Sequence, residues 1–226
     1  MRNFIKNRCC IPSAKLETDG YDWWKRHAEK CEIVQKKKFD IIFFGDSITH
    51  FWSKEDGVNY GEGHWDEIFA EKSVLNLGFG YDRIQNVLWR ITNGELANQE
   101  PKVIVINIGT NQYLKTPNYP GENSRDTAEG ITFLVKKLHE EYPETQILVM
   151  AIFPRGSLMD QIQETNSLLH QWIPEIPNVK LIDIFDQFLK KDSPTRKPDE
   201  QYFQKDLCHL NRNGYCLWYD AIKEYL

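Results

Sequence analysis

The 226-residue sequence has no apolar run approaching the ~20 residues that a membrane-spanning helix needs. Its first residues, 1–11, also lack the uninterrupted apolar stretch of a secretory signal. We therefore expect no membrane span and, unless a leader has been removed, a cytoplasmic protein. Internal repeats and low-complexity tracts are missing as well, which excludes a repeat architecture.

Cysteines are few, and their spacing suggests neither a metal site nor a disulfide framework. They are odd in number and include no CxxC pair: Cys9, Cys10, Cys31, Cys208 and Cys216. Reduced thiols are expected, with no metal and no organic cofactor. The net charge is −5, and the basic residues are dispersed apart from a run at 36–38 that is typical of a solvated helix end. A nucleic-acid partner is therefore not expected.

Five short apolar runs rich in β-branched residues predict strands at 39–44, 73–77, 103–108, 146–152 and 179–184. The runs are nearly continuous in hydrophobicity, as in parallel sheets that helices cover on both faces. Helical patterns lie before, between and after them, at 21–37, 83–97, 125–142, 161–173 and 211–226. We predict one α/β domain over 1–226, with 1–20 as an N-terminal extension. Its expected architecture is a three-layer α/β/α sandwich with a mostly parallel, five-stranded, flavodoxin-like sheet.

A serine follows the first predicted strand, in the sequence Gly45-Asp46-Ser47. Gly45 permits a tight turn, so Ser47 would begin a helix, where free backbone N–H groups favour a developing oxyanion. Asp46 or Ser47 could instead be an ordinary helix cap. A serine hydroxyl needs a base to become a nucleophile.

Asp206 and His209 supply a base and a carboxylate to orient it. They are three residues apart, a spacing that brings side chains onto one face of a helical turn. Such a carboxylate can accept the Nδ1 proton while Nε2 faces Ser47. The alternatives are a surface aspartate beside a capping histidine, a metal site, and a thiol nucleophile at Cys208.

Two further polar clusters follow strands and should reach the same sheet edge. Asn111 comes after Gly109-Thr110, and its carboxamide can donate to a tetrahedral oxyanion. Asparagine is also a common turn residue. The turn at 78–82 could deliver a backbone N–H to the same place.

In their order and spacing these motifs resemble the SGNH (GDSL-like) hydrolase family over almost the whole chain, from about Phe39 onward. The resemblance implies that Ser47 is the nucleophile, His209 the general base and then acid, and Asp206 its orienter. It also implies an oxyanion hole made by the Ser47 N–H, a second-block N–H and the Asn111 side chain. The family usually has glycine where this sequence has Tyr81, so either Gly80 or Tyr81 could supply the second N–H.

Segment 86–96 and the sequence Phe153-Pro154-Arg155-Gly156 look like the catalytic subunits of intracellular platelet-activating-factor acetylhydrolases and their bacterial relatives. That likeness implies cleavage of short acyl groups, chiefly acetyl, and makes a homodimer plausible. From these resemblances we expect a serine esterase acting on a small-molecule acetyl ester, with a carbohydrate favoured as the alcohol. A lipid acetylhydrolase or lysophospholipase-type esterase, a non-catalytic binding protein and a metal-dependent phosphoesterase are the alternatives.

Aromatic residues near the motifs are candidates for the substrate pocket. With Asp46, the predicted pocket residues are Trp52, Tyr81 and Tyr113, and Tyr119 is a further candidate for the rim. Trp23 and Trp24 are expected to pack against the sheet rather than to bind sugar. His50, His64, His139 and His170 have no carboxylate at a suggestive spacing and are expected to be structural or surface residues.

Overall fold

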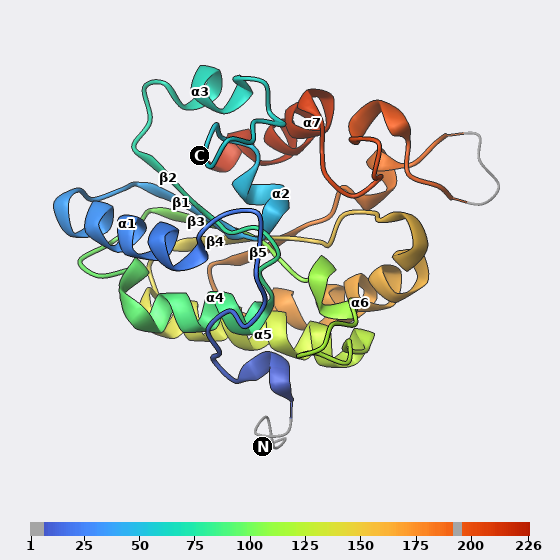
Figure 1. Cartoon of the computed structure of the whole chain (residues 1–226), viewed down its shortest axis with the longest axis horizontal. Coiled ribbons are helices and arrows are strands. Elements are labelled where there is room, and N and C mark those ends of the chain that lie inside the picture. The colour runs from blue at the N-terminus through green and yellow to red at the C-terminus, as the bar shows by residue number, and fades with distance from the viewer. Residues whose placement is uncertain (1–6, 192–195) are drawn as a thin grey trace.

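The computed structural model describes residues 7–191 and 196–226, and its centre is a five-stranded parallel sheet (Figure 1). The strands are β1 (Ile41–Gly45), β2 (Val74–Gly78), β3 (Val103–Asn107), β4 (Gln146–Met150) and β5 (Val179–Ile182). They lie in the order β2-β1-β3-β4-β5, and all neighbouring pairs are parallel. The predicted α/β class is confirmed.

Helices cover both faces of this sheet. One face carries α1 (Trp23–Lys36), α4 (Ile84–Arg90), α5 (Ser124–Glu141) and α6 (Met159–Trp172), and the other carries α3 (His64–Phe69) and α7 (Arg212–Ile222) (Figure 1). The short α2 (Ser47–His50) follows β1 directly. Strands β1 and β3 are buried along their whole length, which explains why their sequences show no alternation.

The predicted helix at 83–97 is shorter than expected, because the α-helical conformation stops at Arg90. A π-helical turn, Ile91–Glu95, follows and contains a kink at Asn93 and Gly94, where Gly94 has a φ of 109°. Glycine tolerates this left-handed conformation, and the kink turns the Glu95 side chain into the interior. Glu95 is therefore placed beside Arg90.

Residues 7–20, here called the N-terminal strap, run along the helical layer toward the sheet edge (Figure 1). The strap begins with a 3₁₀ turn, Arg8–Cys10, that packs on α5. Further along, the Ser13 N–H donates to the Gln85 carbonyl at 3.0 Å, and the Asn86 side chain donates to the Ser13 carbonyl at 3.0 Å. The strap is thus tied to both α5 and α4.

Candidate active site

Ser47 begins α2 at the carboxyl end of the central strand β1. Asp46 caps this helix, accepting a hydrogen bond from the Ile48 N–H at 2.9 Å. Only glycine fits at position 45, because a Cβ there would lie 2.1 Å from the Thr49 hydroxyl oxygen and 2.4 Å from the Asn107 carbonyl oxygen. The close packing holds Ser47 at the helix N-terminus, where it is 6% exposed.

The C-terminal segment brings Asp206 and His209 to Ser47. His209 Nε2 lies 2.8 Å from Ser47 Oγ, and His209 Nδ1 lies 2.6 Å from Asp206 Oδ2. A turn, not the expected helical face, produces this geometry: Leu207 has a φ of 51°, and Asp206 Oδ1 accepts the Cys208 and His209 N–H groups, both at 3.0 Å. The three side chains form one continuous chain of hydrogen bonds.

The local environment keeps Asp206 ionised. Partial burial acts to raise its pKa, but hydrogen bonds from the His209 side chain and from two backbone N–H groups outweigh burial and lower the pKa. Cys208 is unlike a reactive thiol, since burial raises its pKa to about 12. Within residues 7–191 and 196–226, no group of three or more His, Cys, Asp or Glu side chains is arranged to hold a metal.

Asn111 reaches the same sheet edge from the loop after β3. Its side-chain amide donates to the Asp82 carbonyl at 3.1 Å, which leaves its second N–H available. Arg155, after β4, lies 3.5 Å from Asn111 Oδ1 and 3.4 Å from the Thr110 carbonyl oxygen. Arg155 was not predicted as a site residue, although its position after a central strand was a usable signal.

The loop after β2 forms a tight turn, in which the Asp82 N–H donates to the Phe79 carbonyl at 3.1 Å. The Phe79 N–H donates to the Gly45 carbonyl at 3.0 Å, and the Gly80 N–H donates to His50 Nδ1 at 3.1 Å. Across the described chain, no acceptor contacts the Tyr81 N–H. Of the two N–H groups considered from sequence, Gly80 is therefore engaged and Tyr81 is open.

Tyr81 has a φ of 60° in this turn, a left-handed conformation that strongly favours glycine. The residue is 59% exposed. The loop therefore has an exposed tyrosine at a strained backbone position, and the open N–H belongs to the same residue.

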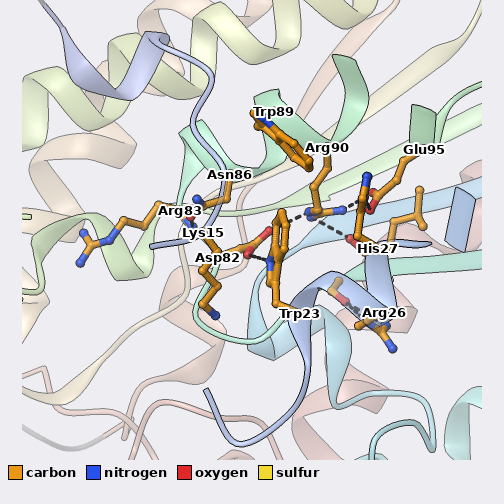
Figure 2. A network of polar contacts seen from close by, with 12 residues as sticks. Lys15, Trp23, Arg26, His27, Asp82, Arg83, Asn86, Trp89, Arg90 and Glu95 are labelled. Carbon is orange, nitrogen blue, oxygen red and sulfur yellow. Dashed lines mark hydrogen bonds and ion pairs between the residues drawn. The ribbon is translucent and has the colours of Figure 1, made fainter. Parts of the chain in front are cut away.

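A network of buried charges lies beneath the loop (Figure 2). Asp82 accepts hydrogen bonds from Trp23 Nε1 at 2.7 Å and from Arg90 Nε at 2.8 Å, and Arg90 also pairs with Glu95. His27 Nδ1 lies 2.9 Å from Glu95 Oε1. Trp23 is thus buried, as expected, and anchors Asp82, whereas Trp24, for which packing against the sheet was also expected, is 54% exposed.

His50 is a buried structural residue, as expected, but it has a carboxylate partner that the sequence spacing did not indicate. Its Nε2 lies 3.0 Å from Asp56 Oδ2. Burial, followed by the nearby cations, lowers the pKa of His50 to about 2, so the ring is neutral and its Nδ1 accepts the Gly80 N–H. His170 also has an unpredicted carboxylate partner, with its Nε2 2.6 Å from Asp183 Oδ2.

Three aromatic pocket candidates lie elsewhere. Trp52 is fully buried and stacks on Tyr215 with ring centroids 5.0 Å apart, because the chain turns into the core after α2. The Tyr113 hydroxyl lies 2.7 Å from the Thr165 hydroxyl, against α6. Tyr119 is buried under the Arg83 guanidinium, whose carbon lies 4.4 Å from the ring centroid.

Two aromatic residues that sequence reasoning missed lie beside the imidazole. The Phe51 and Tyr60 ring centroids are 5.4 Å and 5.6 Å from that of His209. Asp46, the remaining pocket candidate, is fully buried behind Ser47, and burial raises its pKa to about 7. Its Oδ2 has no hydrogen-bond partner among the described residues.

This arrangement matches a known class of hydrolases. The model of the GDSL-like lipase/acylhydrolase family matches residues 43–217, and the chain belongs to this family. It is 31% identical over 214 residues to platelet-activating factor acetylhydrolase IB subunit alpha2 of Rattus norvegicus, a match that covers 92% of this chain and 86% of the relative.

Solved structures share the fold. A lipase/acylhydrolase from Enterococcus faecalis superposes with a TM-score of 0.63 at 19% identity, covering 84% of this chain and 94% of that one. The acetyl xylan esterase AlAXEase superposes with a TM-score of 0.61 at 21% identity, covering 84% and 100%. In the part of the chain that the structure describes, no helix is long and apolar enough to cross a membrane.

Proposed function

We propose that this protein is a serine esterase that hydrolyses acetyl and other short-chain esters, with an O-acetylated carbohydrate as the favoured substrate. The observation that carries the proposal is the chain of hydrogen bonds from Ser47 through His209 to Asp206. In such a chain the hydroxyl attacks the ester carbonyl while the imidazole takes its proton, and the carboxylate stabilises the imidazolium.

The remaining steps follow from the same geometry. His209 gives the proton to the leaving alcohol, and an acyl group stays on Ser47. Water then attacks the acyl-enzyme with His209 again as the base. The open N–H groups of Asn111 and Tyr81, with the N–H of Ser47, are the donors that we assign to the oxyanion.

The short acyl group is supported by the relatives, since the curated relatives and one structural neighbour are named for acetyl hydrolysis. The polar alcohol is supported by the surface. The exposed large apolar residues of the described ranges are Ile11, Leu16, Trp24, Ile33 and Tyr81. Only Tyr81 belongs to a loop that carries the site. A single ring suits stacking on a sugar better than contact with a lipid chain.

A panel of substrates tests the proposal. We expect p-nitrophenyl acetate to be cleaved faster than the butyrate, and the octanoate slowest, and Ser47→Ala to lose both activity and labelling by a fluorophosphonate. O-acetylated xylo-oligosaccharides and an sn-2-acetyl phospholipid then separate the two alcohol classes. Preference for the phospholipid would favour the lipid alternative, and a Ser47→Ala variant with full activity would refute the mechanism.

A further inference from the structure

One buried cation of the N-terminal strap contacts the oxyanion loop directly. Lys15 Nζ donates to the Gly80 carbonyl at 2.6 Å and to Asp19 Oδ2 at 2.8 Å. The Lys15 side chain is only 2% exposed, and the Tyr21 hydroxyl donates to the same carbonyl at 3.2 Å. Two donors therefore converge on one carbonyl oxygen, 65 residues from Lys15 in sequence.

The carbonyl of Gly80 and the N–H of Tyr81 are the two ends of one planar peptide group. In a trans peptide they point in opposite directions, so fixing the carbonyl also fixes the N–H. The positive φ of Tyr81 is that of the third residue of a type II turn, whose central peptide takes no part in the turn's own hydrogen bond. The N–H on the far side of the peptide from Lys15 is the one left without an acceptor.

The loop that carries this peptide group is bonded to the segments that carry Ser47 and Asn111. The loop is bonded to the residue two before Ser47, through the Phe79 N–H and the Gly45 carbonyl, and to the Asn111 side chain through the Asp82 carbonyl. His50 binds the preceding N–H, that of Gly80, and so prevents it from competing for the oxyanion. The N–H groups of Phe79, Gly80 and Asp82 thus have acceptors, whereas the Tyr81 N–H contacts none in the described chain.

The charge on Lys15 also has an electrostatic effect. A buried ammonium at a carbonyl oxygen polarises the whole peptide group, and hydrogen bonds in series strengthen one another at low dielectric. Burial, followed by the charges of Asp82 and Asp19, raises the pKa of Tyr21 far above its ordinary value, so its hydroxyl remains a neutral donor. Both contacts make the Tyr81 N–H a stronger and better oriented donor.

We propose that Lys15, assisted by Tyr21, is a positioning residue of the oxyanion hole: it holds and polarises the Gly80–Tyr81 peptide so that the Tyr81 N–H stabilises the tetrahedral intermediate. The strap is then part of the catalytic apparatus and not a mere extension of the domain. This inference rests on the proposed esterase function.

The test compares Lys15→Met, which keeps the aliphatic stem, with Lys15→Arg, which keeps the charge. We expect Lys15→Met to lower kcat/KM for p-nitrophenyl acetate by about 10- to 100-fold, less than loss of a direct donor. Lys15→Arg should recover part of this loss, and Tyr21→Phe should cost about two- to five-fold, since it removes a neutral hydrogen bond. Glu17→Gln is the matched control on the same strap, because Glu17 contacts the Thr116 hydroxyl and not the loop.

The decisive readout is the inhibition constant of an aryl trifluoromethyl ketone, which forms a tetrahedral adduct on the serine. This constant does not depend on the fraction of correctly folded enzyme, so a merely structural role for Lys15 would leave it unchanged. We expect the inhibition constant to rise in Lys15→Met by the same factor by which kcat/KM falls. Because Lys15→Met leaves Asp19 without its cation, Lys15→Met with Asp19→Asn serves as a second variant, with the same expected change.

Two results would overturn the inference while leaving the esterase function intact. One is wild-type kcat/KM in the Lys15→Met variants, and the other is a lowered kcat/KM with an unchanged inhibition constant. Failure of the proposed function itself has a different signature: the wild-type protein would neither hydrolyse the panel nor label at Ser47.

Discussion

The site and the network beneath it use their charges in opposite ways. The Asp206 side chain is 48% exposed and that of His209 is 22% exposed, whereas Asp82, Arg90 and Glu95 have no exposed surface. Charges near water can change protonation at little cost to the fold, while buried charges depend on their partners. The exposed set is suited to proton transfer, and the buried set holds the loop that aims the Tyr81 N–H.

Replacing the exposed carboxylate should give the largest effect, and it should be on activity alone. Asp206→Asn keeps the shape but favours the wrong tautomer of His209, so kcat should fall by about 10⁴-fold. The free energy of unfolding should change by less than about 1 kcal/mol at neutral pH, because the pair is partly solvated. Ester hydrolysis and urea unfolding measured on the same preparation check both expectations. A large loss of stability in Asp206→Asn would contradict the contrast between the exposed charges of the site and the buried charges beneath the loop.

Replacing the buried arginine should reverse this pattern. Arg90→Met leaves Asp82 and Glu95 buried without their cation, and we expect a loss of about 3–5 kcal/mol in the free energy of unfolding. The loss should be smaller at pH 6 than at pH 8, because burial raises the pKa of Asp82 to about 6, and a protonated carboxyl no longer needs a cation beside it. Lys102→Met, on an exposed ion pair with Asp40, is the control and should change stability little. Equal losses of unfolding free energy in Arg90→Met and Lys102→Met would show that burial of the ion pair does not determine its effect on stability.

Asp46 sharpens the comparison, because it is a buried carboxyl next to the nucleophile. Its pKa is raised to about 7, above the unfolded value, so its charged form destabilises the fold as the pH rises through 7. Asp46→Asn preserves the cap oxygen, and we expect it to be more stable than wild type at pH 8 by on the order of 2 kcal/mol. The difference should shrink as the pH falls from 7 toward 4. Thermal unfolding across this range measures it, and a difference that grows toward low pH would show the opposite sign.

Tyr81 should give the smallest change in stability and the most specific change in function. Tyr81→Gly removes the strain of a left-handed tyrosine but gives the unfolded chain more freedom, so the net change should stay within about 1 kcal/mol. Turnover of p-nitrophenyl acetate should stay within about three-fold, because the backbone N–H remains. KM for an O-acetylated oligosaccharide should rise. Tyr81→Ala loses the ring but keeps the strain, so an unchanged KM in both variants would exclude contact with the alcohol.

The sheet and the meeting of Ser47 and Asn111 at one sheet edge could be predicted because both depend on local signals, whereas His209 follows no strand, and its pairing with Ser47 was expected from its chemistry and from the family resemblance. Continuous apolar runs define buried parallel strands, and short motifs after those strands must meet at one edge. The roles drawn from the family resemblance remain predictions, whereas the contacts between the three side chains are observed.

The contacts beneath the loop could not be predicted, because no local pattern encodes them. Lys15 and Gly80 lie far apart in sequence, and a lone lysine in an extension is ordinarily solvated. Trp52 was predicted in the substrate pocket but lies in the core for a related reason. Closeness to Ser47 in sequence does not show which way the chain turns after a four-residue helix. His50 was missed because Asp56 reaches it through a turn, where Asp56 has a φ of 50°.

Position 130 of α5 is a glycine, and its lack of a side chain has a consequence for the sheet edge that carries Ser47 and the Gly80–Tyr81 peptide. A Cβ at this position would lie 2.4 Å from the Cβ of Cys9, so the first turn of the strap fits into a notch on the helix. A single methyl group there would push the strap outward and weaken the hydrogen bond from Lys15 to the Gly80 carbonyl. The rate of ester cleavage would then respond to a change on the surface of a helix that never touches the ester.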